Sequence, residues 1–130
     1  YPSEIKKRDE NANFYSYELN KIGVKKTPFI YQNNTSVYAQ YTIEVNNRDL
    51  FQKRLKALGI PTAIHYPQIL PLQPVFRSKK EYVNAKNENT EAFNASQRVV
   101  SLPFHPWLKK ADINYIVDKV NKVIHEDDFV

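Results

Sequence analysis

The chain has 130 residues, of which 42% are hydrophobic, and its formal net charge is +5 at pH 7. This length and apolar content suffice for one domain with a single core. No stretch approaches the roughly 18 consecutive apolar residues of a membrane-spanning helix, and the polar start is unlike a signal peptide, so we expect a soluble, cytoplasmic protein. Cysteine is absent, which excludes disulfides, thiol nucleophiles and thiolate metal sites.

Methionine is absent as well, so we interpret residues 1–130 as a single domain that belongs to a longer protein. The positive charge is spread over short pairs, such as Lys25 with Lys26 and Lys109 with Lys110. Short dispersed pairs are typical of solvated faces. They are equally compatible with a ligand that carries phosphate.

An amphipathic helix is predicted near the N-terminus, with Ser3 as its N-cap and Gly23 just past its end. Its apolar stripe consists of Ile5, Ala12, Tyr15, Leu19 and Ile22. After a polar connector, residues 36–45 alternate between apolar and polar side chains, which predicts a strand. The face of this strand that points to the core would carry Val37, Ala39, Tyr41, Ile43 and Val45.

A second helix is predicted from Arg48 to Leu58, because three apolar residues recur there at helical spacing after the turn-forming Asn46 and Asn47. Gly59 ends this helix, and a short second strand follows at residues 62–64. The proline residues of the next stretch are expected to keep residues 68–75 from forming regular structure: Pro67, Pro71 and Pro74.

The second half of the chain begins with a polar stretch, residues 76–90, which is typical of a mobile surface segment. A short helix at residues 91–97, a third strand at residues 98–102 and a strongly amphipathic helix at residues 112–125 follow. Together these elements predict an α+β fold in which helices cover a small, three-stranded, mainly antiparallel sheet, with one helix at each end of the chain.

The most informative residues for function are His65 and Tyr66, which follow the second strand directly and are held by Pro67. An imidazole beside a phenol offers hydrogen bonding and a flat ring, which suits a sugar or a nucleotide. The alternative is a histidine that is satisfied by a backbone carbonyl at the end of the strand.

His105 lies in a second loop of the same kind, between Phe104 and Pro106 and ahead of Trp107. If the two preceding strands are neighbours, this histidine approaches His65, although a packed aromatic corner is the favoured interpretation. The chain's three histidines lack the HxxxH or HxH spacing of a metal site, so we expect no metal.

Four segments, in this order, resemble the C-terminal part of the DegT/StrS-type sugar aminotransferases, which depend on pyridoxal 5′-phosphate (PLP). They are SVYAQYTI at 36–43, the helix start Arg48-Asp49, GIPT at 59–62 with HYP at 65–67, and SLPFHP at 101–106. The first helix is similar to the helix that follows the large domain in that family. The resemblance therefore covers nearly the whole chain.

The resemblance implies the aspartate aminotransferase type of fold, in which an upstream large domain holds PLP on a lysine and a small domain closes over the site. It implies transfer of an amino group, normally from glutamate, to a keto-sugar nucleotide for polysaccharide or cell-surface glycan biosynthesis. His65, Tyr66 and His105 would then bind the substrate. The full-length protein would be a homodimer, whereas this chain alone would have no catalytic residue, bind no PLP and be inactive.

The family pattern changes just beyond the HYP motif. Relatives often continue as HYPxPLHxQ, whereas this chain reads HYPQILPLQ at 65–73, with Pro71 in place of the second histidine. The polar contact of that histidine is therefore not expected here.

The competing interpretation is a freestanding basic module that binds nucleic acid, with Tyr38, Tyr66 and Trp107 as stacking platforms among lysines. A purely structural interaction domain is a third possibility. The sugar aminotransferase interpretation expects neither nucleic acid nor a membrane as a partner, and it expects the protein's own large domain and a nucleotide sugar.

Overall fold

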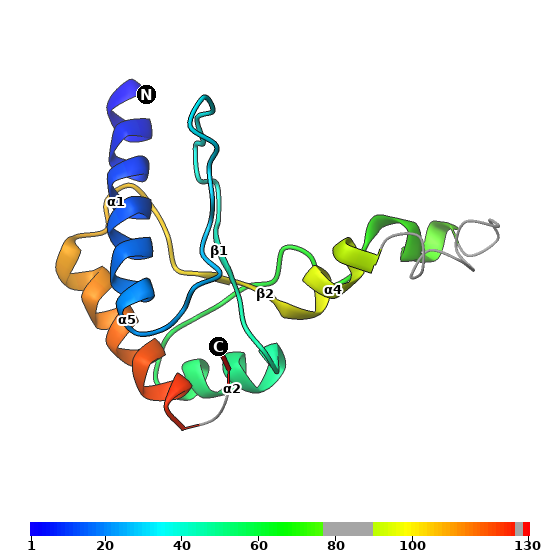
Figure 1. Cartoon of the computed structure of the whole chain (residues 1–130). Coiled ribbons are helices and arrows are strands. Elements are labelled where there is room, and N and C mark those ends of the chain that lie inside the picture. Colours follow the sequence, from blue (N-terminus) through cyan, green and yellow to red (C-terminus); the bar gives the residue numbers. More distant parts are fainter. Residues whose placement is uncertain (77–89, 127–128) are drawn as a thin grey trace.

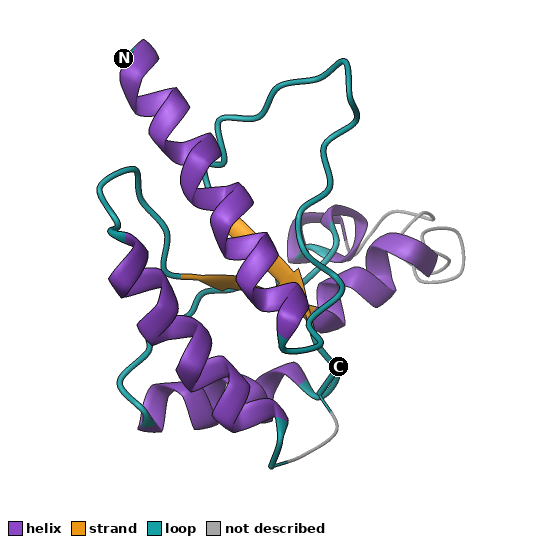
Figure 2. Ribbon diagram, turned by 60° about the vertical axis from the view of Figure 1, so that its left-hand side comes forward, coloured by secondary structure: helices purple, strands orange, loops and turns teal. Residues whose placement is uncertain are grey.

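The computed structural model describes residues 1–76, 90–126 and 129–130. Its helices and strands are α1 (Pro2–Lys21), β1 (Tyr41–Glu44), α2 (Arg48–Ala57), α4 (Thr90–Arg98), β2 (Val99–Leu102) and α5 (Lys110–Ile124), with two short 3₁₀ turns at Leu70–Leu72 and Pro74–Phe76. Helices α1 and α5 pack side by side, and α2 packs against α5 and β2 (Figures 1 and 2). The predicted α+β class is confirmed.

Strands β1 and β2 form an antiparallel pair in which Thr42 lies opposite Ser101 and Ile43 lies opposite Val100. The predicted strand at 62–64 contributes only one bridge, from Ala63 to Ser101, with N–H···O distances of 3.1 and 2.8 Å. Pro61 lacks an N–H group and cannot extend this pairing as a donor. The predicted three-stranded sheet is therefore two strands plus a bridge.

Strand β1 is shorter than predicted because Tyr38 has a φ of 43°, in the left-handed region that interrupts an extended chain. Val37 and Ala39 are exposed, whereas Tyr38 itself is buried. The prediction for residues 36–40 was therefore wrong. From Tyr41 onward the alternation holds, since Tyr41, Ile43 and Val45 are buried.

Several helix boundaries differ from the prediction. Helix α1 begins at Pro2 after the N-cap Tyr1, so the predicted cap at Ser3 was wrong; proline suits the first helical turn. Helix α5 begins at Lys110, because Asp112 lies in its first turn and accepts the Lys109 N–H at 2.8 Å. Gly23 and Gly59 follow α1 and α2 with φ values of 99° and 81°, as the predicted helix ends require.

The stretch after the HYP motif is more regular than predicted, because 3₁₀ turns occupy 70–72 and 74–76 and place Pro71 and Pro74 where their fixed φ is tolerated. The polar stretch predicted as a surface segment falls almost entirely at 77–89, outside the described residues. The helix predicted next to it is confirmed as α4.

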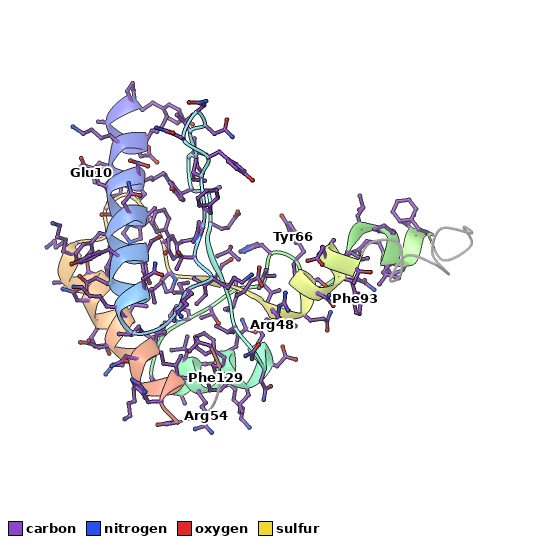
Figure 3. The ribbon with its side chains drawn as sticks, in the orientation of Figure 1. Glu10, Arg48, Arg54, Tyr66, Phe93 and Phe129 are labelled. Atoms are coloured by element: carbon purple, nitrogen blue, oxygen red, sulfur yellow. The ribbon has the colours of Figure 1, made fainter. Side chains whose placement is uncertain are left out.

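Residues 67–76 and α4 extend away from the helical body (Figures 1 and 3). Buried Arg48 at the start of α2 connects this extension to the body: its Nη1 donates to the carbonyl of Ser96, and its Nε donates to Asp49 Oδ1 at 3.0 Å. A small apolar cluster of Ile69 and Leu72 with Phe93 holds the extension together. Phe93 lies on α4, well apart from Arg48 (Figure 3).

The core between the sheet and α1 is organised by an aromatic stack. The Tyr15 ring lies on the Tyr41 ring at 4.6 Å between centroids, and Tyr41 stacks in turn on Phe104 at 5.6 Å. The Tyr41 hydroxyl is 2.8 Å from Ser16 Oγ. The Tyr15 hydroxyl is buried and makes no hydrogen bond within the part of the chain that the structure describes. The Tyr41 hydroxyl therefore stabilises the fold through a hydrogen bond, whereas the Tyr15 hydroxyl is buried without one.

Asn11 fastens the loop after β2 to α1. Its Nδ2 lies 3.3, 3.3 and 3.2 Å from the carbonyl oxygens of His105, Pro106 and Leu108. A single side-chain amide thus lies within hydrogen-bond distance of three backbone carbonyls of the loop that carries His105. Figure 2 shows this loop beside α1, leading into α5.

The two stacked tyrosines give opposite predictions. Tyr15→Phe removes a buried hydroxyl that lacks a partner and should raise the free energy of unfolding by up to about 1 kcal/mol, whereas Tyr41→Phe loses the bond to Ser16 and should lower it by about 1 kcal/mol. Urea denaturation of both variants measures this. A clear loss of stability in Tyr15→Phe would contradict the assignment.

The same residues predict an alkaline limit to stability. Burial raises the pKa of both phenols above their ordinary value, and the neighbouring Tyr41 adds to the effect at Tyr15. In the unfolded chain these groups ionise near pH 10, so their contribution is intact below that pH and is lost as the pH rises above it. The loss above about pH 10 should be smaller in Tyr15→Phe, in the same denaturation assay.

Candidate functional site

A cavity of about 430 Å³ opens where the bridge meets the sheet. Its walls come from residues 39–40, 61–63, 65 and 101–104, which bring together the residues just before β1, the bridge segment and the end of β2 with the residues that follow it. Polar groups from Gln40, Thr62, His65 and Ser101 face apolar ones from Leu102 and Phe104. This combination is typical of sites for small polar ligands.

His65 lines this cavity and is half-buried. Its Nδ1 is 2.9 Å from Ser101 Oγ, so its partner is a side-chain hydroxyl rather than the backbone carbonyl of the alternative interpretation. Its Nε2 makes no hydrogen bond to any described residue. One ring nitrogen is therefore fixed by the protein and the other is free for a ligand.

Tyr66 stands beside His65, ring edge to ring face, with centroids 5.6 Å apart and planes at 89°. Its side chain is 70% exposed and lies at the base of the extension that leads to α4 (Figure 3). An exposed aromatic ring beside a histidine that lines a polar cavity offers a stacking surface for a sugar or a base.

His105 is placed differently from His65. Its side chain is exposed, and its Nδ1 accepts the backbone N–H of Trp107 at 3.2 Å. Phe104, not His105, contributes to the wall of the cavity. In this loop Phe104 packs on Tyr41 while His105 and Trp107 are exposed, and the structure does not bring the two histidines together at this cavity.

Ser101 and Thr42, which lie next to His65 in a chain of polar contacts, are among the residues that were not identified from the sequence as parts of the site. Ser101 is buried, and its Oγ lies 2.8 Å from Thr42 Oγ1 as well as 2.9 Å from His65. Its true neighbours depend on the pairing of β1 with β2, for which the chain itself carries no local signal.

The rim of the cavity is also tied to α2, since Gln52 Nε2 donates to Thr62 Oγ1 at 2.9 Å. This bond and the Ala63 bridge fix the segment that carries His65 from both sides. The imidazole is therefore presented on a segment held by side-chain and backbone bonds, although that segment has little regular structure.

A larger cavity of about 510 Å³ lies at the other end of the sheet, with Lys25, Lys26, Arg98 and the last residues of the chain around it. Arg98 is already paired there with Glu44 at 3.2 Å. None of the predicted site residues lines this cavity. We therefore assign the smaller cavity, which contains His65, as the candidate site.

The described residues also limit other interpretations. They contain no group of three or more His, Asp or Glu side chains that could hold a metal ion, and no helix among them is long and apolar enough to cross a membrane. Tyr38, one of the three predicted stacking platforms for nucleic acid, is only 8% exposed and pairs with Phe104, so that prediction was wrong. Trp107 is 63% exposed, and Lys7 Nζ lies 3.8 Å from the centroid of its ring.

Comparison with known proteins gives concordant matches. The chain is 41% identical over 116 residues to the UDP-2-acetamido-2-deoxy-3-oxo-D-glucuronate aminotransferase of Pseudomonas aeruginosa, covering 89% of this chain and 30% of that protein. It is 33% identical over 89 residues to the UDP-N-acetyl-3-dehydro-alpha-D-glucosamine 3-aminotransferase of Acidithiobacillus ferrooxidans, covering 68% of this chain and 23% of that protein.

A solved structure matches as well. A DegT DnrJ EryC1 StrS aminotransferase from Brucella abortus superimposes with a TM-score of 0.74 at 32% identity, over 92% of this chain and 31% of that one. The chain thus spans less than a third of the length of these relatives. Residues 2–121 match the DegT/DnrJ/EryC1/StrS aminotransferase family, and the chain belongs to this family.

Proposed function

We propose that this chain is the C-terminal part of an enzyme that uses PLP to transfer an amino group from an amino-acid donor, glutamate, to a keto-sugar nucleotide. The observation that carries the proposal is that His65 lines a polar cavity and contacts the exposed ring of Tyr66, in a chain that matches the family from residue 2 to residue 121. The Pseudomonas and Acidithiobacillus relatives are both named for UDP-linked oxo sugars, which favours UDP as the nucleotide.

The chemistry of the cavity supports such a substrate. The free Nε2 of His65 can bond to an oxygen of the diphosphate or the sugar, and Gln40 and Thr62 add an amide and a hydroxyl. The exposed ring of Tyr66 can stack on a flat base or on a sugar face. The net charge of +5 favours a ligand with a diphosphate. His105 would contact the substrate from outside this cavity.

PLP itself does not fit the residues present here. Among the residues that the structure describes, no lysine lines the candidate cavity, and PLP enzymes of this kind hold the cofactor on a lysine. The cofactor and its lysine would therefore come from residues outside this chain, in a homodimer of the longer protein. The contribution of this chain is to bind the nucleotide end of the substrate and so orient the sugar, which turns remote binding energy into rate.

The substrate contacts are tested by His65→Ala and Tyr66→Ala in the full natural polypeptide. Each should weaken the binding of UDP about tenfold, measured by isothermal titration calorimetry, because each removes one polar or stacking contact. Tyr115→Ala is the matched control, since Tyr115 is also an exposed aromatic residue but lies on α5. Unchanged affinity in both variants would overturn this part of the proposal.

The proposal that this chain binds substrate while other residues of the longer protein hold PLP gives a second prediction. The 130-residue chain mixed with PLP, glutamate and a UDP-linked keto sugar should produce no amino sugar and should retain no PLP absorbance after dialysis, because it offers no lysine at the site. The full natural polypeptide should produce the amino sugar and should retain PLP absorbance after dialysis. Amino transfer by the isolated chain would contradict the proposal.

The nucleic-acid alternative is weakened by the burial of Tyr38, one of its three stacking platforms. We expect no binding of a generic single-stranded oligonucleotide to the full natural polypeptide even at low salt, in a fluorescence anisotropy titration at two salt concentrations. Binding that is strong at low salt and falls steeply at high salt would instead favour the basic-module interpretation.

A further inference from the structure

Ser101 is held in place by its pairing with two segments, the Ala63 bridge and strand β1. Its backbone N–H and carbonyl both pair with Ala63, at 2.8 and 3.1 Å, and its residue position is opposite Thr42 in the β1–β2 register. Its side chain is buried, with 5% of the residue exposed. The Ser101 hydroxyl therefore occupies a defined point between β1 and the segment that carries His65.

This hydroxyl is the middle member of a chain of three polar groups. Thr42 Oγ1 is 2.8 Å from Ser101 Oγ, and Ser101 Oγ is 2.9 Å from His65 Nδ1. Each hydroxyl has one hydrogen to donate. If Thr42 donates to Ser101 and Ser101 donates to Nδ1, both hydrogens have acceptors.

The opposite direction is less favourable. If Nδ1 carried a proton and donated it to Ser101, then Ser101 would donate to Thr42, and the Thr42 hydrogen would have no acceptor among the described residues. Buried and partly buried donors are rarely left unpaired, because the lost hydrogen bond costs free energy. The bond directions therefore favour an acceptor role for Nδ1.

From this geometry we infer that Ser101, oriented by Thr42, is a positioning residue that holds His65 as the neutral tautomer with its proton on Nε2. The remaining nitrogen of the ring is then an N–H donor at the cavity, suited to an oxygen of the ligand rather than to a donor group. The contact between Nε2 and a nucleotide oxygen rests on the proposed function. The role of Ser101 in setting the tautomer of His65 is independent of the proposed function.

The experiment is ¹⁵N NMR of the full natural polypeptide labelled at histidine, without ligand and at a pH where the imidazole is neutral. In the natural protein, His65 should show an unprotonated Nδ1 and a protonated Nε2. Ser101→Ala should shift His65 toward a mixture of the two tautomers, and Ser101→Thr, which keeps a hydroxyl, should restore the original signals. A purely structural role for Ser101 would not produce this pattern.

Thr42→Val is the second variant. Valine has the same shape as threonine, so this variant removes only the hydroxyl, and Thr42 is more exposed than Ser101. It should move the tautomer signals in the same direction as Ser101→Ala, though less far. A protonated Nδ1 in the natural protein, or unchanged signals in folded Thr42→Val and Ser101→Ala, would overturn the inference.

Titration with UDP separates this inference from the proposed function. Ser101→Ala should weaken UDP binding about three- to tenfold, because the N–H donor is no longer held in one form. If the natural protein binds no UDP while its tautomer signals still depend on Ser101, the proposed ligand is wrong and the positioning role stands.

Discussion

The pairing of β1 with β2 is the constraint on which the rest of the structure depends. Its register sets Thr42 opposite Ser101, and Ser101 in turn pairs with Ala63 of the segment that carries His65. The same pairing carries the Tyr41 ring, which stacks between Tyr15 of α1 and Phe104. A shift of one residue would reverse the face of every side chain in the strand, so the core and the cavity would be lost together.

A sheet of two short strands has little apolar surface of its own, so the helices supply most of the core. Helices α1, α2 and α5 bury side chains against each other and against the strands, as in Leu19, Phe51 and Val120. The extension with α4 shares little of this core, since its main anchor is the buried Arg48 and its own cluster is small. A charged group is suited to that task because its hydrogen bonds to a carbonyl and a carboxylate satisfy it at low exposure.

The candidate site depends on the β1–β2 pairing and on the helices that hold the sheet in place. Its groups are suited to recognition, with one free imidazole nitrogen, an exposed phenol ring and a few hydroxyl and amide groups, and no lysine lies among them. Such a set is suited to binding and orienting a polar ligand. This agrees with a chain that covers less than a third of the length of its relatives.

The sequence by itself determined the helices, the α+β class and the family, because helical periodicity, Gly59 and the HYP and SLPFHP segments are local features. It also pointed to His65 and Tyr66, whose roles as substrate contacts stay predictions. Only the tertiary structure decided that Tyr38 turns inward, that the third strand is a single bridge and that His105 stays apart from the cavity. These outcomes, and the chain from Thr42 through Ser101 to His65, depend on contacts between residues far apart in the sequence, such as Thr42 and Ser101 at 59 positions, which no local pattern encodes.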